Sequence, residues 1–229
     1  MCGILGIKIK NPGEEDYALV RNLFLESMIR GKHATGVSYV KNGTIVTVKE
    51  PIPANEFISK QNIGDWVNED GNLYCIGHIR YSTSDLNYNQ PFSSADISIV
   101  HNGVISQEHP STWQQTYNLK TETANDSELI LRCLEHGGQP LNKFENASMA
   151  VCVLFADKTL VGFRNEARPL YYYTDEKITI FTSTENIAWR AGFIRATKTE
   201  MYKIYMQTEN KYGKFEVSGE PPVNVEDLQ

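Results

Sequence analysis

The sequence predicts an α+β fold in which two largely antiparallel β-sheets pack together and helices cover their outer faces. Three observations support this prediction: short apolar strands outnumber helices, a strong hairpin signal lies at Asn42-Gly43, and no repeat or linker divides the chain. A length of 229 residues with 41% hydrophobic content suits a protein with a substantial core. We therefore expect a single domain over residues 1–218 and an extended or disordered tail over residues 219–229.

The amino-terminal half begins with a strand. Residues 3–9 are mostly apolar, which indicates a buried strand that ties down the chain terminus. Apolar side chains at helical spacing predict a helix over residues 15–30, ended by Gly31. Residues 36–49 alternate around Asn42-Gly43, a pattern typical of a β-hairpin. The other elements expected here are a short helix over 54–60 and buried strands over 73–81 and 97–101.

The carboxy-terminal half begins with a helix signal. Asn125 and Glu128 have the spacing of a capping box, which predicts a helix that runs to His136 and stops at Gly137-Gly138. The continuous apolar run over residues 148–155 is typical of a strand that is buried on both faces. We expect the following strands to continue as a meander. They lie over 159–164, 170–174 and 177–183, followed by a short helix over 184–191 and two weaker strands within 200–218.

Charge and composition exclude several kinds of partner. The net charge is −6, the pI is near 5.4, and no cluster of five Lys or Arg residues occurs, which argues against a nucleic-acid partner. The chain has no signal peptide and no stretch of membrane-spanning length, so we expect no membrane partner and a cytoplasmic location. The four cysteines are widely separated, which is typical of free thiols in a reducing compartment.

Cys2 directly follows Met1. Removal of Met1 would give Cys2 both a thiol and a free α-amine, whose ordinary pKa of roughly 7.7–8.0 lets it act as a base near neutral pH. A nucleophile and its base would then share one residue, as in N-terminal nucleophile enzymes. The alternative is that Cys2 is only a small hydrophobic residue at the start of a strand.

Four separated segments of the chain together resemble the class II glutamine amidotransferases, which are N-terminal-nucleophile hydrolases. These segments are Cys2–Ile7, Arg30–Gly36, Gly77–Thr83 and His101–Gly103, with weaker matches at Asn125–Glu128, Arg164–Leu170 and Ser183–Glu185. The resemblance implies a four-layer αββα sandwich of the N-terminal-nucleophile type. It also implies that residues 1–218 form a type-2 glutamine amidotransferase domain, in which His101–Gly103 is a turn.

The resemblance assigns the chemistry to three of these residues. Cys2 is the expected nucleophile, and the Asn102 side-chain amide and the Gly103 backbone N–H are the expected donors to the oxyanion. Arg30 is expected to support the loop beside the nucleophile. The alternative for Asn102-Gly103 is a plain turn after the strand over 97–101.

Glutamine carries an α-carboxylate and an α-ammonium group that must also be recognised. The Arg80 guanidinium can grip the carboxylate with two charge-assisted hydrogen bonds, and Thr83 would add a hydroxyl contact. Asp126 is the expected partner of the ammonium, although it could instead serve only to cap a helix. His101 is expected at the substrate site as a supporting group and not as a base, because the α-amine of Cys2 already supplies one.

We expect neither a metal nor a cofactor. The spacing of the candidate ligands matches no zinc pattern, and the chain has no phosphate-binding glycine motif. The candidates considered for zinc are Cys2, Cys75, His33, His78 and His101.

The sequence therefore predicts a glutaminase that hydrolyses the amide of glutamine through a Cys2 thioester. Since residues after 219 cannot form an acceptor domain, we expect a separate synthetase or other protein to accept the ammonia. The segment Gln90-Pro91-Phe92 resembles purine-pathway relatives, whereas Ser84-Asp85 departs from the sugar-forming ones. Two alternatives stay open: a hydrolase of another γ-glutamyl amide, and a non-catalytic glutamine-binding subunit.

Overall fold

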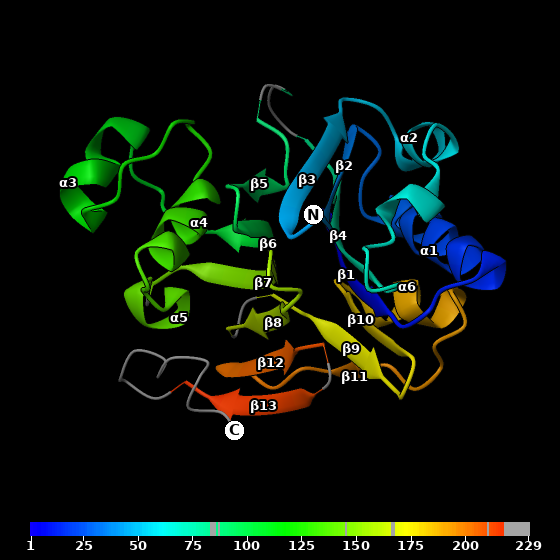
Figure 1. Ribbon diagram of the computed structural model, residues 1–229. Coiled ribbons are helices and arrows are strands. Elements are labelled where there is room, and N and C mark those ends of the chain that lie inside the picture. Colours follow the sequence, from blue (N-terminus) through cyan, green and yellow to red (C-terminus); the bar gives the residue numbers. More distant parts are fainter. Residues whose placement is uncertain (83–85, 87, 145, 166–167, 210, 218–229) are drawn as a thin grey trace.

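The computed structural model describes residues 1–82, 86, 88–144, 146–165, 168–209 and 211–217, and Figure 1 shows their arrangement. Within these residues the strands form two sheets, and every strand pair is antiparallel. Thr83 and the predicted tail over 219–229 lie outside the described residues, so these two predictions stay predictions.

The first sheet carries the amino-terminal strand at its centre. Its strand order is β11-β9-β10-β1-β4-β2-β3. The bounds are β1 (Gly3–Ile9), β2 (Ala34–Lys41), β3 (Thr44–Glu50), β4 (Leu73–Arg80), β9 (Tyr171–Thr174), β10 (Ile178–Thr182) and β11 (Thr197–Lys198).

The second sheet is built around the most apolar segment of the chain, β7, which is buried along most of its length. Its strand order is β13-β12-β8-β7-β6-β5. The bounds are β5 (Phe92–Ser93), β6 (Ile97–Val104), β7 (Ser148–Phe155), β8 (Leu160–Arg164), β12 (Lys203–Gln207) and β13 (Tyr212–Glu216).

Helices cover the outer face of each sheet, on opposite sides of the molecule in Figure 1. On the first sheet they are α1 (Glu14–Glu26), α2 (Ala54–Ser59) and α6 (Glu185–Arg190), and on the second α3 (Trp113–Tyr117), α4 (Glu128–Glu135) and α5 (Pro140–Lys143). Three 3-10 turns, at Ser27–Ile29, Ile63–Trp66 and Pro110–Thr112, complete the helical segments. Each helical layer has its own apolar core, and a third core lies between the sheets. The predicted four-layer αββα sandwich is therefore confirmed.

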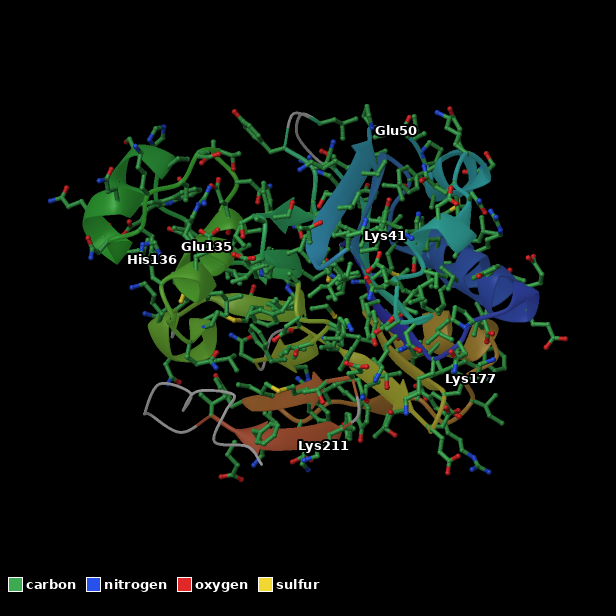
Figure 2. The ribbon with its side chains drawn as sticks, in the orientation of Figure 1. Lys41, Glu50, Glu135, His136, Lys177 and Lys211 are labelled. Atoms are coloured by element: carbon green, nitrogen blue, oxygen red, sulfur yellow. The ribbon has the colours of Figure 1, made fainter. Side chains whose placement is uncertain are left out.

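Several polar and charged side chains lie at the periphery of these layers. Figure 2 shows Glu135 and His136 at the end of α4, and Lys177 and Lys211 at the outer edges of the molecule; all four are exposed. Among the described residues, none of the helices has the length and apolar character that crossing a membrane would require.

Several local predictions are confirmed. The strand over residues 3–9 is β1, and the hairpin over 36–49 is β2-β3. Its turn residues Asn42 and Gly43 have φ values of 50° and 69°, which asparagine and glycine tolerate best. The helix over 15–30 is shorter than expected, because α1 ends at Glu26 and a 3-10 turn follows.

The strands predicted over 159–164, 170–174 and 177–183 are present as β8, β9 and β10, but the prediction that they continue as one meander is wrong. β7 and β8 pair in the second sheet, but the chain then crosses to the first sheet, where β9 pairs with β10 and β10 pairs with β1. Local apolar patterns give strands but do not say which sheet each strand joins. The crossing gives β1 a partner on its second edge.

The predicted capping box is also wrong, although a helix does begin there. The Glu128 carboxylate accepts hydrogen bonds from the backbone N–H groups of Glu122 and Thr123 at 2.8 Å each, and it pairs with Arg132. The backbone N–H of Asn125 donates instead to Thr123 Oγ1 at 3.3 Å. The Glu128 carboxylate thus binds the backbone of the loop before the helix and does not cap the helix start. The helix ends at Glu135, one residue before the expected end.

Phe181 on β10 joins the two sheets through apolar packing. Its fully buried ring lies against Gly6 of β1 and Gly162 of β8, so glycines on both sheets provide the space that it fills. A Cβ atom added at Gly162 would lie 2.4 Å from the ring.

We expect Gly162→Ala to lower the free energy of unfolding by roughly 1–3 kcal/mol, because the added methyl overpacks the space between the sheets. Urea denaturation measures the change. Gly64→Ala is the matched control, since its Cβ would meet no atom closer than 3.5 Å. Equal stability of the two variants would contradict the proposed packing role of Phe181.

Candidate active site

Six of the eight predicted site residues line one cavity of about 200 Å³ at the start of β1, which we call the Cys2 cavity. They come from four separate parts of the chain: Cys2, Arg80, His101, Asn102, Gly103 and Asp126. A seventh, Arg30, touches Cys2 from the turn after α1. Thr83, the eighth, lies outside the described residues. The fold thus brings together segments that the sequence resemblance had linked only by motif.

Cys2 is held by its backbone and by its sulfur. Its carbonyl oxygen accepts hydrogen bonds from Asn102 Nδ2 at 2.7 Å and from Arg30 Nε at 3.3 Å. Its Sγ atom lies 3.4 Å from the backbone nitrogen of Tyr81, at the end of β4. Figure 1 marks the N-terminus close to β6, which carries Asn102, and to β4, which Tyr81 directly follows. The thiol is therefore fixed at the meeting point of the two sheets while it stays partly exposed.

Asn102 and Gly103 are not a turn, which corrects both the predicted end of the strand at residue 101 and the expected His-Asn-Gly turn. β6 continues through them to Val104, and they pair with Ala150 and Met149 of β7. Gly103 has a φ of 147°, and a Cβ there would lie 1.7 Å from the carbonyl oxygen of Ser148. Only glycine fits this bend at the end of the strand.

Arg80 and Asp126 are each fixed by neighbouring groups. Arg80 Nη1 donates to the carbonyl oxygen of Tyr88 at 2.8 Å and to Asn89 Oδ1 at 2.7 Å. Asp126 Oδ2 accepts from the backbone nitrogen of Ile105 at 2.6 Å. Both residues line the Cys2 cavity, so it offers a cation and an anion to one small ligand.

His101 is buried and neutral. Its Nδ1 atom lies 2.8 Å from Ser127 Oγ, and its Nε2 atom lies 3.2 Å from the carbonyl oxygen of Ser148. Burial lowers the pKa of this imidazole below its usual range. A neutral ring with both nitrogens engaged is suited to support the site and not to remove a proton.

His78 differs from His101 in its hydrogen bonding. It is 1% exposed, lines the Cys2 cavity from β4, and within the described residues neither ring nitrogen has a hydrogen-bond partner. Burial, and secondarily the positive charge of Arg80, lowers the pKa of His78 to about 3. The ring therefore stays uncharged at neutral pH.

Sequence reasoning missed several residues that line the Cys2 cavity, among them Gln90, Ser127 and Arg168. Arg168 Nη1 donates to the sulfur of Met1 at 3.3 Å, so this arginine faces the chain terminus. It lies in the segment Arg164–Leu170, which resembles the family, but a weak motif does not say which of its residues reaches the site. Ser127 adjoins Asp126, and no motif singled out its hydroxyl.

Among the residues that the structure describes, no group of three or more His, Cys, Asp or Glu side chains is arranged to hold a metal ion. The cavity offers instead a thiol, an amide, a guanidinium and a carboxylate. This set suits an organic ligand with charges of both signs.

Comparison with known families identifies the kind of domain. The profile of the glutamine amidotransferase domain family matches residues 61–217, which is more than half of the chain. Cys2 and Arg30 lie before the matched range. A Methanocaldococcus jannaschii protein provisionally named as a glutamine-hydrolyzing asparagine synthetase is 30% identical over 129 residues. That match covers 47% of this chain and 25% of the relative, so the chain spans only a quarter of that protein.

Solved structures share the fold. Glutamine phosphoribosylpyrophosphate amidotransferase from Bacillus subtilis superposes with a TM-score of 0.72 at 17% identity, over 96% of this chain and 50% of that one. A structure described as the allosteric regulatory enzyme of purine biosynthesis gives 0.68 at 18% identity, with the same coverage. A protein from Silicibacter pomeroyi described as a glutamine aminotransferase class-II domain protein gives 0.58 at 10% identity, over 95% of this chain and 100% of that chain.

The pKa of His78 predicts an acid-sensitive fold. An unfolded histidine has a pKa of about 6.5, and the folded value is lowered to about 3, so the unfolded chain binds more protons between these values. This part of the stability is present above pH 6.5 and is lost as the pH falls towards 3, by at most about 1.4 kcal/mol per pH unit. We expect His78→Gln to lose less stability than the wild type between pH 7 and pH 4.5 in urea unfolding. Parallel losses would show that His78 is not the group responsible.

Proposed function

The chain belongs to the glutamine amidotransferase domain family, as an enzyme domain of its class II, and on this premise we propose that it hydrolyses the side-chain amide of glutamine. The observation that carries the proposal is the Cys2 cavity. There the Cys2 thiol, the Asn102 amide, Arg80 and Asp126 surround one space of about 200 Å³. A thiol nucleophile, an amide donor and two opposite charges are what a free α-amino acid with a side-chain amide requires.

We propose that the charged end of glutamine binds between Arg80 and Asp126. The guanidinium pairs with the α-carboxylate, and the carboxylate of Asp126 accepts from the α-ammonium. The described bonds of Asp126 use Oδ2, so Oδ1 is the oxygen that meets the ligand. Thr83 stays a predicted hydroxyl contact to the same carboxylate. This pairing directs the amide of glutamine towards Cys2.

The reaction begins once Met1 has been removed. The α-amine of Cys2 takes the thiol proton, and Sγ attacks the amide carbon. Negative charge develops on the amide oxygen, where Asn102 Nδ2 and the Gly103 N–H donate to it. The nitrogen takes the proton from the α-ammonium and leaves as ammonia, which gives a γ-glutamyl thioester. Water then adds to the thioester carbon, the C–S bond breaks, and glutamate leaves with the thiol restored.

Arg30 supports this arrangement through the Cys2 carbonyl. Its Nε donates to that oxygen, which orients the residue that bears both the nucleophile and the base. Asn102 Nδ2 donates to the same carbonyl at 2.7 Å, and its second hydrogen can serve the oxyanion.

We propose that a separate synthetase or other acceptor protein uses the ammonia. The chain spans about half of each of the first two solved chains that it superposes on, so it corresponds to one part of those proteins. We also expect a cytoplasmic location. The acceptor itself is a proposal that rests on the relatives.

Cys2→Ala should abolish release of glutamate from glutamine, because no other described residue supplies a thiol in the cavity. The assay is a coupled measurement of glutamate, with the N-terminal mass of the same sample read alongside. Activity that persists in Cys2→Ala would rule out the thioester. An inactive wild type with Met1 removed that hydrolyses a substituted γ-glutamyl amide would favour the alternative hydrolase. An inactive protein that keeps Met1 would favour the non-catalytic subunit.

Arg80→Lys should raise the KM for glutamine by roughly 10- to 100-fold with a smaller effect on kcat, because the two-pronged grip on the carboxylate is lost before the reaction starts. Arg21→Lys is the matched control, since among the described residues Arg21 donates to the carbonyls of Ile58 and Gln61 beside α2, away from the Cys2 cavity. Steady-state kinetics measures KM and kcat for glutamine in both variants. An unchanged KM in Arg80→Lys would remove Arg80 from the substrate site.

A further inference from the structure

Within the described residues, β5 pairs with β6 only as far as Phe92, so the edge of β6 beside His101, next to the proposed oxyanion donors, has no paired strand residue. β5 pairs with β6 through Phe92↔Ile99 and Ser93↔Ser98, and this register would next place Gln90 opposite His101. Pro91 has no backbone N–H, and the strand β5 begins only at Phe92. The backbone of His101, the residue before Asn102, therefore needs other partners on this edge.

The side chain of Gln90 supplies those partners. Its Oε1 atom accepts from the backbone nitrogen of His101 at 2.6 Å, and its Nε2 atom donates to the carbonyl oxygen of His101 at 3.1 Å. A primary amide has the same donor and acceptor as a peptide group, so Gln90 takes the place of a paired strand residue. Gln90 is 7% exposed and His101 is 3% exposed, so water competes little for these bonds.

The same amide reaches the start of α4. Gln90 Nε2 also lies 3.2 Å from Ser127 Oγ, which in turn bonds His101 Nδ1 at 2.8 Å. Ser127 is 3% exposed and directly follows Asp126. Gln90, His101 and Ser127 thus form a closed buried network between the strand of Asn102 and the helix start of Asp126.

The segment around Gln90 is itself anchored. Lys49 Nζ donates to the carbonyl oxygens of Asn89 at 2.8 Å and Pro91 at 3.0 Å, on both sides of Gln90. A Cβ atom at Gly36 of β2 would lie 2.4 Å from the Gln90 carbonyl, so the first sheet packs directly against this segment. Gln90 is therefore a fixed support for the edge of β6.

We propose that Gln90 is the positioning residue of the oxyanion site: its side-chain amide clamps the His101 backbone and so sets where Asn102 Nδ2 and the Gly103 N–H point. The inference rests on the proposed function. Donors to a developing charge act well only when they are already in place, and a displacement of about 1 Å can cost on the order of 100-fold in rate.

The test separates ground-state binding from oxyanion binding. Glutamate keeps the charged groups that meet Arg80 and Asp126, and so reports the ground state. The γ-aldehyde of glutamate adds the Cys2 thiol across its C=O bond. A C–S bond forms, the π bond opens, the thiol proton passes to the α-amine of Cys2 and nothing leaves, so the charged oxygen of the adduct occupies the oxyanion site. Both affinities are measured by calorimetry on the mature protein, together with kcat for glutamine.

In Gln90→Met we expect kcat and the affinity for the aldehyde to fall together by roughly 10- to 100-fold, while the affinity for glutamate stays within about 3-fold. Gln207→Met is the matched control. Gln207 is 6% exposed and also makes three hydrogen bonds, to Thr179, Thr208 and Lys211. Thr179 pairs with Lys8 of β1, which lies six residues, or roughly 20 Å, along the chain from Cys2. Gln207→Met should therefore change neither kcat nor the ratio of the aldehyde affinity to the glutamate affinity.

Gln90→Glu provides a second readout. A carboxylate still accepts from the His101 N–H, but it presents an oxygen to the His101 carbonyl and repels it. When the carboxyl is protonated, its O–H can donate as the amide does. The kcat of this variant relative to the wild type should therefore rise as the pH falls from 8 to 5.5, which a loss of stability alone would not produce.

Three results would overturn the inference. They are an aldehyde-to-glutamate affinity ratio in Gln90→Met equal to that of the wild type, an equal loss of both affinities, and a pH-independent defect in Gln90→Glu. A wild type that binds both compounds but does not hydrolyse glutamine would reject the proposed function, while the affinity ratio would still decide the role of Gln90. A wild type that binds neither would overturn both.

Discussion

The structure depends on the way β1 is held from both edges. β4 pairs with it from Gly3↔Ile79 onward, and β10 pairs with it on the opposite edge from Leu5↔Thr182 onward. Backbone hydrogen bonds on two sides fix the register of this strand. Cys2 directly precedes β1, so the main-chain hydrogen bonds of this strand position the Cys2 thiol. An edge strand would leave the same cysteine free to fray.

The candidate site then requires that the two sheets dock correctly. The first sheet supplies Cys2 and Arg80, whereas the second supplies Asn102 and Gly103, and Asp126 stands before the helix that covers the second sheet. The contact between Asn102 and the Cys2 carbonyl is therefore a contact between sheets. The apolar side chains packed between the sheets therefore set the distance between the Cys2 thiol and its donors. Core packing and site geometry thus both depend on how the two sheets contact each other.

The sequence predicted what depends on local patterns or on separated motifs. The β2-β3 hairpin follows from Asn42-Gly43, and six residues chosen by chemistry and family resemblance line a single cavity. It did not predict the transfer of β9 and β10 to the first sheet, because burial patterns are alike in both sheets. Glu128 was misjudged since its partner is a loop six residues away and not the helix start. Gln90 was recognised only as part of a family-like segment, because a side chain that imitates a strand partner leaves no periodic signal.

The four cysteines differ in their access to reagents. Cys75, Cys133 and Cys152 are buried and burial raises the pKa of each thiol, to about 11 for Cys133, whereas Cys2 is partly exposed. Buried, protonated thiols react slowly with electrophiles and peroxides. Oxidants and alkylating agents therefore meet Cys2 first, which makes the protein vulnerable at a single atom. The same selectivity means that one equivalent of a thiol-specific label counts the accessible Cys2 thiols in a preparation.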